Sequence, residues 1–107
     1  MTQAPARTDE QRSEALAKAL ATRQERARVR AALRDRSLRP IDVLVGAEQQ
    51  PVWATMRVSW LLEAVPGIGP VRADRIMESV GIARSRRIQG LGERQRTALI
   101  AVLEERG

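Results

Sequence analysis

The large apolar residues of this 107-residue chain are distributed unevenly, and that distribution limits where a core can form. Only six Val, Ile, Leu, Met and Trp residues lie within positions 1–40, whereas twenty-four lie within positions 41–107. Charge follows the opposite trend, because the first forty residues have a net charge of +5 and the remainder has +1. A chain of this length holds one small core. We therefore expect a basic N-terminal helix over residues 1–37 and one compact domain over residues 38–107.

No segment alternates apolar and polar residues over a useful length, so we expect an all-α fold. Thr8-Asp9-Glu10-Gln11 has the capping-box spacing, and no Gly or Pro follows until after Arg36. These features predict a long helix from about Asp9 to about Arg36. The stretches 48–55 and 82–92 are interpreted as connecting loops. Helix start and stop residues predict four more helices, at 40–46, 58–65, 70–80 and 93–105.

The sequence contains no His, Cys, Tyr or Phe. Without them the chain has no imidazole or thiolate metal ligand and no Ser-His or Cys-His nucleophile pair. We therefore expect no metal, no cofactor and no enzymatic activity. No apolar run is long enough for a membrane span, and the N-terminus is polar, so we expect a monomeric cytoplasmic protein without a signal peptide.

The net charge is +6, and eighteen of the nineteen basic residues are Arg. Guanidinium groups make planar, bidentate contacts to phosphate, so the composition favours a polyanionic partner. The alternative is an Arg-rich proteome, which gives the same number of arginines without such a partner. Arginines recur at three- and four-residue steps along one face of the first predicted helix. This face is a candidate second DNA surface, with an ordinary solvated face as the alternative. Its members are Arg23, Arg26, Arg30 and Arg34.

An apolar helix runs into Pro66-Gly67-Ile68-Gly69-Pro70, and another predicted helix follows. Gly67 and Gly69 permit positive φ and close approach to a ligand, while Ile68 can fill the core between the helices. The second helix directs free amides, including that of Val71, and its positive end outwards beside Arg72. The pattern resembles the helix-hairpin-helix DNA-binding motif, which contacts backbone phosphates and reads little sequence. A tight turn between two packed helices is the alternative.

A second basic segment precedes the last predicted helix. Arg86 and Arg87 are followed by Gly90 and Gly92, and the helix start carries Arg94. Arg side chains on such a loop can enter a narrow minor groove, and the glycines let the backbone approach the sugar-phosphate wall. A solvated connector is the alternative. Two helix starts with basic flanks predict a compact helix-two-turn-helix module that binds both sides of a groove.

The only aromatic residues are Trp53 and Trp60. Trp60 lies in an apolar helix, and we expect it in the core. We expect Trp53 to pack its loop onto the core, with insertion between base steps as the alternative. So few aromatic side chains disfavour single-strand binding by base stacking.

Three segments, at 56–69, 76–78 and 85–95, resemble the actinobacterial integration host factor family in order and spacing. They include Val65-Pro66-Gly67-Ile68-Gly69 and Arg86-Arg87-Ile88-Gln89-Gly90-Leu91-Gly92, and the resemblance covers about residues 40–104. It implies a nucleoid-associated protein that binds double-stranded DNA with little sequence specificity and bends and compacts it. It also implies effects on transcription and chromosome organisation, and assistance to phage integrase acting on DNA.

The resemblance further implies that Gly67, Ile68 and Gly69 hold phosphate and that Arg86 and Arg87 enter the minor groove. Mycobacterial members have an arginine where this chain has Gln89, whose amide can still donate to a base edge or a sugar. A ribosomal small-subunit protein shares the pattern more loosely, so structured RNA is an alternative ligand. A role as a DNA-repair module is an alternative function. The predicted DNA-binding residues are Gly67, Ile68, Gly69, Val71, Arg72, Arg86, Arg87, Gln89, Gly90, Gly92 and Arg94.

Overall fold

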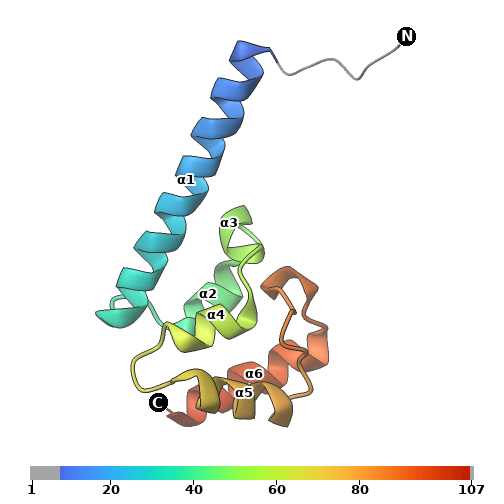
Figure 1. Ribbon diagram of the computed structural model, residues 1–107. Coiled ribbons are helices and arrows are strands. Elements are labelled where there is room, and N and C mark those ends of the chain that lie inside the picture. The colour runs from blue at the N-terminus through green and yellow to red at the C-terminus, as the bar shows by residue number, and fades with distance from the viewer. Residues whose placement is uncertain (1–7, 107) are drawn as a thin grey trace.

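The computed structural model describes residues 8–106, and every regular element in this part of the chain is helical (Figure 1). This confirms the all-α expectation. The elements are α1 (Asp9–Arg34), α2 (Pro40–Gly46), α3 (Pro51–Ala54), α4 (Val58–Glu63), α5 (Pro70–Ser79), the 3₁₀ turn η1 (Ile88–Gly90) and α6 (Glu93–Arg106). No helix within residues 8–106 is both long enough and apolar enough to cross a membrane.

The long helix α1 begins with the predicted capping box. The Gln11 amide donates to Thr8 Oγ1 at 3.1 Å, and the Thr8 amide donates to Gln11 Oε1 at 2.9 Å. These two bonds satisfy backbone donors that an uncapped helix start leaves open. The helix ends slightly before the predicted Arg36 because the Asp35 carboxylate accepts the Ser37 amide at 2.8 Å and Arg36 takes the left-handed conformation, with φ of 67°.

The expectation of a loop over residues 48–55 was wrong, because Pro51–Ala54 form the single helical turn α3. Pro51 occupies the first turn, where its missing amide costs nothing and its fixed φ suits a helix. The turn directs Trp53 into the core, where 9% of its surface remains exposed. The predicted packing of Trp53 is thereby confirmed, although a short helix and not a loop carries it.

The core contains residues from α1 as well as from the shorter helices that follow it. Val29 and Leu33, from the C-terminal part of α1, are almost completely buried. The outer half of α1 contributes nothing comparable, since Leu16 and Leu20 are 63% and 45% exposed. Figure 1 shows this half projecting from the compact group of shorter helices. The other fully buried large residues include Val43 and Leu44 of α2, Val58, Leu61 and Leu62 of α4, and Leu99 of α6.

Two helix pairs position the basic segments. Helix α4 packs against α5, and α2 packs against α6. The turn between α4 and α5 lies beside the C-terminal end of α6, since a Cβ atom added at Gly67 would lie 3.6 Å from the Arg106 guanidinium. Gly81 has φ of +69° and ends α5 as predicted, with the Ile82 amide donating to the Met77 carbonyl at 2.9 Å.

Candidate nucleic-acid interface

The turn between α4 and α5 has an exposed backbone and a buried anchor. Ile68 is 3% exposed, as predicted for a residue that fills the core. Gly67 has φ of +86°, a conformation that L side chains rarely adopt. Gly69 does not use the positive φ that glycine permits, because its φ of −90° and ψ of −178° are open to any residue. A Cβ atom added at Gly69 would meet nothing within 4 Å, so the Gly69 backbone lies open to a ligand.

Gly69 is also the N-cap of α5, and no side chain caps this helix start. The first amides of a helix have no partner within the helix, and Pro70 at the first position has none to offer. The amides of Val71 and Arg72 therefore remain as donors at the positive end of the helix dipole. The Val71 side chain is 66% exposed, and Arg72 lies beside the turn, donating to the Gly67 carbonyl at 3.3 Å.

The second basic segment is held in place by its backbone. Arg57 and Arg87 form an isolated antiparallel bridge. The Val58 amide donates to the Arg86 carbonyl at 3.0 Å, and the Ile88 amide donates to the Met56 carbonyl at 2.9 Å. Ile88 is buried and anchors the segment from below. The loop that was interpreted as a connector thus includes a fixed strand-like contact followed by η1.

The arginines of this segment have different partners. Arg84 forms ion pairs with Glu63, at 3.9 Å, and with Asp74, which hold it against α4 and α5. The exposed Arg86 lies across Gly90, with its guanidinium donating to the Gly90 carbonyl at 3.3 Å. A Cβ atom at Gly90 would come within 3.0 Å of Arg86 Cδ, so glycine is what allows this side chain to lie flat.

At the start of α6, Gln95 joins two helix ends. Its side chain accepts the Gly92 amide at 3.0 Å and donates to the Gly81 carbonyl at 2.8 Å. The Gly92 amide therefore already has a partner, and the open amides at this helix start belong to the following residues. Gln89, Gly90 and Arg94 are exposed on the same segment.

The two predicted DNA-binding segments flank one short helix. Arg87 is bonded to the residues just before α4, whereas Gly67 and Gly69 follow its C-terminal end. A helix of this length spans about 9 Å at 1.5 Å per residue. Gly69 and Arg87 are both exposed, so neither is enclosed within the molecule.

The arginines of α1 do not form one solvated face. Arg30 stacks on Trp60, with its guanidinium carbon 5.2 Å from the ring centroid, a cation–π distance. Arg26 is partly buried and donates to Thr55 Oγ1 at 3.4 Å. Arg23, Arg30 and Arg34 are exposed, and no side-chain hydrogen bond or ion pair within residues 8–106 is described for Arg23 or Arg34. Trp60 is consequently only partly buried against the core, which corrects the expectation that it lies inside it.

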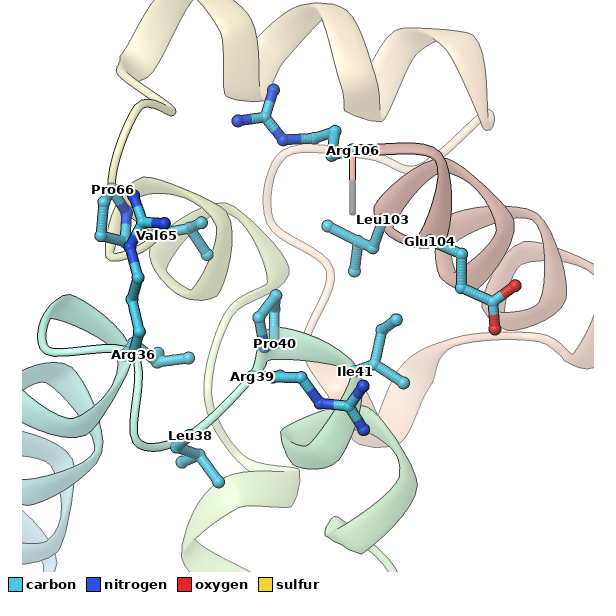
Figure 2. A pocket seen from close by; sticks show the side chains of 11 residues that line it. Arg36, Leu38, Arg39, Pro40, Ile41, Val65, Pro66, Leu103, Glu104 and Arg106 are labelled. Carbon is cyan, nitrogen blue, oxygen red and sulfur yellow. The ribbon is translucent and has the colours of Figure 1, made fainter.

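A cavity of about 500 Å³ lies behind the turn between α4 and α5 (Figure 2). Apolar side chains such as Leu33 and Leu103 line it, together with Arg36, Arg39 and Arg106. Arg39 is paired with Asp42, at 3.0 Å, and this hydrogen-bonded contact lowers the pKa of the Asp42 carboxyl. Within residues 8–106, no group of three or more Asp, Glu, His or Cys residues could hold a metal ion.

Two residues of this region, Thr55 and Arg57, were not predicted as site residues from the sequence. Thr55 receives hydrogen bonds from both Arg26 and Arg87, and Arg57 pairs with Arg87. No spacing signal connects them, because each partner is about thirty residues away along the chain. Only a contact between distant segments identifies them.

The fold and its two helix starts define a helix-two-turn-helix domain, and residues 33–103 match the family model of the S13-like H2TH domain. The integration host factor of Mycolicibacterium smegmatis is 45% identical over 101 residues, covering 94% of this chain and 96% of the relative. That of Mycobacterium tuberculosis is 47% identical over 96 residues, covering 90% of this chain and 91% of the relative. The chain therefore belongs to the integration host factor family. The solved structure of sIHF bound to an 8bp palindromic DNA is also similar, with a TM-score of 0.76, 42% identity, and coverage of 80% of this chain and 97% of that one.

Proposed function

We propose that this protein binds double-stranded DNA with little sequence specificity and bends and compacts it as a nucleoid-associated protein. One observation carries the proposal: the uncapped start of α5 at Gly69 and the arginines at the Arg57–Arg87 bridge flank the short helix α4. Helix amides and guanidinium groups are ligands for phosphate and carry no base code. The similar solved structure, in which sIHF is bound to DNA, supports the same ligand.

The predicted DNA-binding residues divide by the contact that we propose for each. The backbone of Gly67, Ile68 and Gly69 and the amides of Val71 and Arg72 contact phosphate at one end of α4. At the other end, Arg86, Arg87 and Gln89 face the minor groove while Gly90, Gly92 and Arg94 lie along its wall. Because most of these contacts go to the sugar-phosphate backbone, the protein should tolerate many sequences.

Salt dependence of binding to a short duplex tests this function. For about five to eight phosphate contacts, the logarithm of the association constant should fall with the logarithm of salt concentration with a slope of about −4 to −7. Fluorescence anisotropy with two duplexes of unrelated sequence gives both the slope and the specificity. A flat salt response, or binding to one sequence alone, contradicts the proposal.

Structured RNA is the alternative ligand, and a competition assay separates the two. An A-form RNA duplex has a deep, narrow major groove and a wide, shallow minor groove, so a surface shaped for B-DNA should prefer DNA. We expect the RNA duplex to displace labelled DNA only at a large molar excess. Equal competition would favour RNA as the ligand.

The bending and architectural parts of the proposal need separate measurements. Energy transfer between dyes at the two duplex ends should rise on binding if the DNA bends, and sedimentation should show a monomer without DNA. We place the protein on the nucleoid, where it would also assist phage integrase–DNA complexes. We further propose that it has no catalytic activity, so incubation with lesion-bearing DNA should give no product; turnover by pure protein would overturn this.

We propose a division of labour in which residues 38–107 bind DNA and the N-terminal helix supplies a second surface. Arg23 and Arg34 are exposed on α1 and available for a second contact. Replacing both with Gln should reduce bridging between two duplexes more than affinity for one. Unchanged bridging would leave α1 without a role in compaction.

A further inference from the structure

A smaller cavity, of about 270 Å³, lies between α1, α4 and the segment before α4. Arg26, Arg57 and Arg87 line it together with Thr55, Met56 and Trp60. None of the described residues that line it is acidic. Three guanidinium groups around one cavity repel each other unless a negative charge joins them. The three arginines that line this cavity therefore favour an anionic ligand.

Two of these arginines donate hydrogen bonds to the same residue, Thr55. The Arg87 guanidinium donates to the Thr55 carbonyl at 2.6 Å, and the Arg26 guanidinium donates to Thr55 Oγ1 at 3.4 Å. Each guanidinium has five N–H donors, so these bonds leave most of them free. In addition, Nε of Arg26 is buried without a hydrogen-bond partner among residues 8–106. A buried charged donor without an acceptor is costly, and an incoming oxygen ligand would remove that cost.

Other arginine sites in the molecule differ in this respect. Arg84 is paired with Asp74, and Arg39 in the larger cavity is paired with Asp42. Glu104 also lines that larger cavity (Figure 2). Carboxylates of the chain thus already compensate much of the charge there. The smaller cavity is where positive charge gathers without such compensation.

We propose that Arg26, Arg57 and Arg87 form a binding pocket for one phosphate group, which the DNA backbone supplies. Phosphate suits the pocket because its oxygens accept bidentate bonds from guanidinium groups. The inference rests on the proposed DNA binding and deepens it in two ways. Arg87 becomes a phosphate ligand, separate from Arg86, and α1 joins the principal interface through Arg26. DNA binding then holds α1 in a fixed orientation relative to the domain.

The first test compares Arg26→Gln with Arg12→Gln, which makes the same charge change on the projecting half of α1. On a short duplex, Arg26→Gln should weaken binding by about 5- to 30-fold, since one charge-assisted contact to phosphate is lost, and Arg12→Gln by less than about 2-fold. Equal effects of the two variants would mean that only net charge matters, and the pocket proposal would fail. Arg57→Gln changes an exposed side chain and repeats the test if Arg26→Gln does not fold.

The second test asks whether Arg26 and Arg87 act on the same phosphate. In a double-mutant cycle, groups that share a ligand show coupling, whereas distant groups add. The variant with both Arg26→Gln and Arg87→Gln should lose less affinity than the product of the two single losses. A fully multiplicative loss would show two independent contacts and overturn the shared pocket.

The third test separates the DNA backbone from a free phosphate ligand. Trp60 lines the pocket, so its fluorescence should respond to inorganic phosphate at millimolar concentrations if free phosphate enters, and chloride at equal ionic strength should have no effect. A fluorescence response that Arg26→Gln abolishes supports the phosphate pocket. If the DNA affinity of this variant is also normal, the phosphate group comes from a small ligand and not from the DNA backbone. No response together with weaker DNA binding assigns the site to the DNA backbone. No response and normal DNA binding overturn the proposal.

These outcomes also distinguish failure of the pocket from failure of DNA binding. If Arg86→Ala weakens DNA binding and Arg26→Gln does not, the proposed function stands and the DNA-phosphate pocket fails. If the unmodified protein does not bind duplex DNA, the proposed function fails, and the phosphate titration still tests the pocket.

Discussion

The backbones of Arg57 and Arg87 pair as an antiparallel bridge in a part of the chain, residues 8–106, that has no other β-type pairing. The two flanking hydrogen bonds, from Val58 to Arg86 and from Ile88 to Met56, also join backbone atoms. None of these backbone bonds involves an arginine side chain. The Arg86 and Arg87 side chains can therefore be removed to test binding without removing the backbone bonds that hold the loop.

Replacing Arg86 and Arg87 together with Ala should weaken binding to all duplexes similarly, by about 1 to 3 kcal/mol. The reason is that both guanidinium groups are proposed DNA contacts, while the loop keeps its backbone bonds in the variant. Anisotropy titrations on several sequences measure the loss, and thermal unfolding serves as the control. Full affinity with unchanged bending would show that this loop does not contact DNA.

The two glycines of the turn between α4 and α5 should respond differently to Ala. Gly67→Ala should cost about 1 to 2 kcal/mol of stability because φ is +86° there. Gly69→Ala should leave stability nearly unchanged, since φ is −90° and the added methyl group meets no protein atom. It should still weaken DNA binding, because the methyl group occupies the space into which we propose that phosphate approaches. Urea unfolding and DNA titration separate the two effects, and normal DNA affinity of Gly69→Ala would argue against a phosphate contact at this turn.

Gly46→Ala should destabilise the fold by about 1 to 3 kcal/mol through overpacking. A Cβ atom at Gly46 would lie 2.7 Å from Trp53 Cζ3, and Trp53 is buried and cannot easily move aside. Thermal unfolding measures the effect, and Val45→Ala, at a side chain that is 59% exposed, is the matched control. A stability equal to that of the control would mean that α2 and α3 separate at little cost.

The contact between Glu25 and Trp53 should make part of the stability depend on pH. Hydrogen bonds from Arg28 lower the pKa of Glu25 below its ordinary value of 4.5, and the Trp53 indole nitrogen, which donates at 2.8 Å, lowers it further. A lowered pKa in the folded state stabilises the fold above about pH 4.5, and this stabilisation disappears as the pH falls through the lowered value.

Glu25→Gln should therefore be less stable than the unmodified protein at pH 7, by about 1 kcal/mol, and the difference should narrow towards pH 3. Urea unfolding followed by tryptophan fluorescence at both pH values measures it. A difference that is the same at pH 7 and pH 3 would show that the Glu25 charge contributes nothing.

Two truncations should separate the halves of α1. Of the residues that the structure describes, removing 1–20 deletes only the exposed outer half of α1, so the free energy of unfolding should change by less than about 1 kcal/mol. Removing residues 1–36 also deletes Val29 and Leu33 from the core and should cost at least about 4 kcal/mol. If the shorter truncation unfolds the domain, the outer half of α1 has a structural role that its exposure does not indicate.

Local signals predicted most of the helices because helix ends depend on neighbouring residues. The capping box at Thr8, the prolines at 40 and 70, and Gly81 each fix a boundary through their own backbone chemistry. Pro51 carried the same signal for α3, but a single turn is too short for periodicity to show. Similarly, glycine permits a positive φ without requiring it, and the structure has a positive φ at Gly67 but not at Gly69.

The candidate interface divides in the same way. The Gly-Ile-Gly turn and the Arg-Arg segment are each formed by consecutive residues, so residue types and spacing were enough to find them. The environment of Trp60, which is partly buried and has Arg30 stacked on it, depends on where α1 lies and has no local signal. Thr55 and Arg57 belong to the interface only through partners far away along the chain.

The order of residues determined most helix boundaries, most apolar core positions and the two basic segments, because these follow from interactions among near neighbours in the chain. Packing of distant segments fixed which arginines are paired with acids, which lie free, and which three surround one cavity. Charges interact through space and not along the chain, so the difference between Arg84, Arg86 and Arg87 arises only once the helices are packed together.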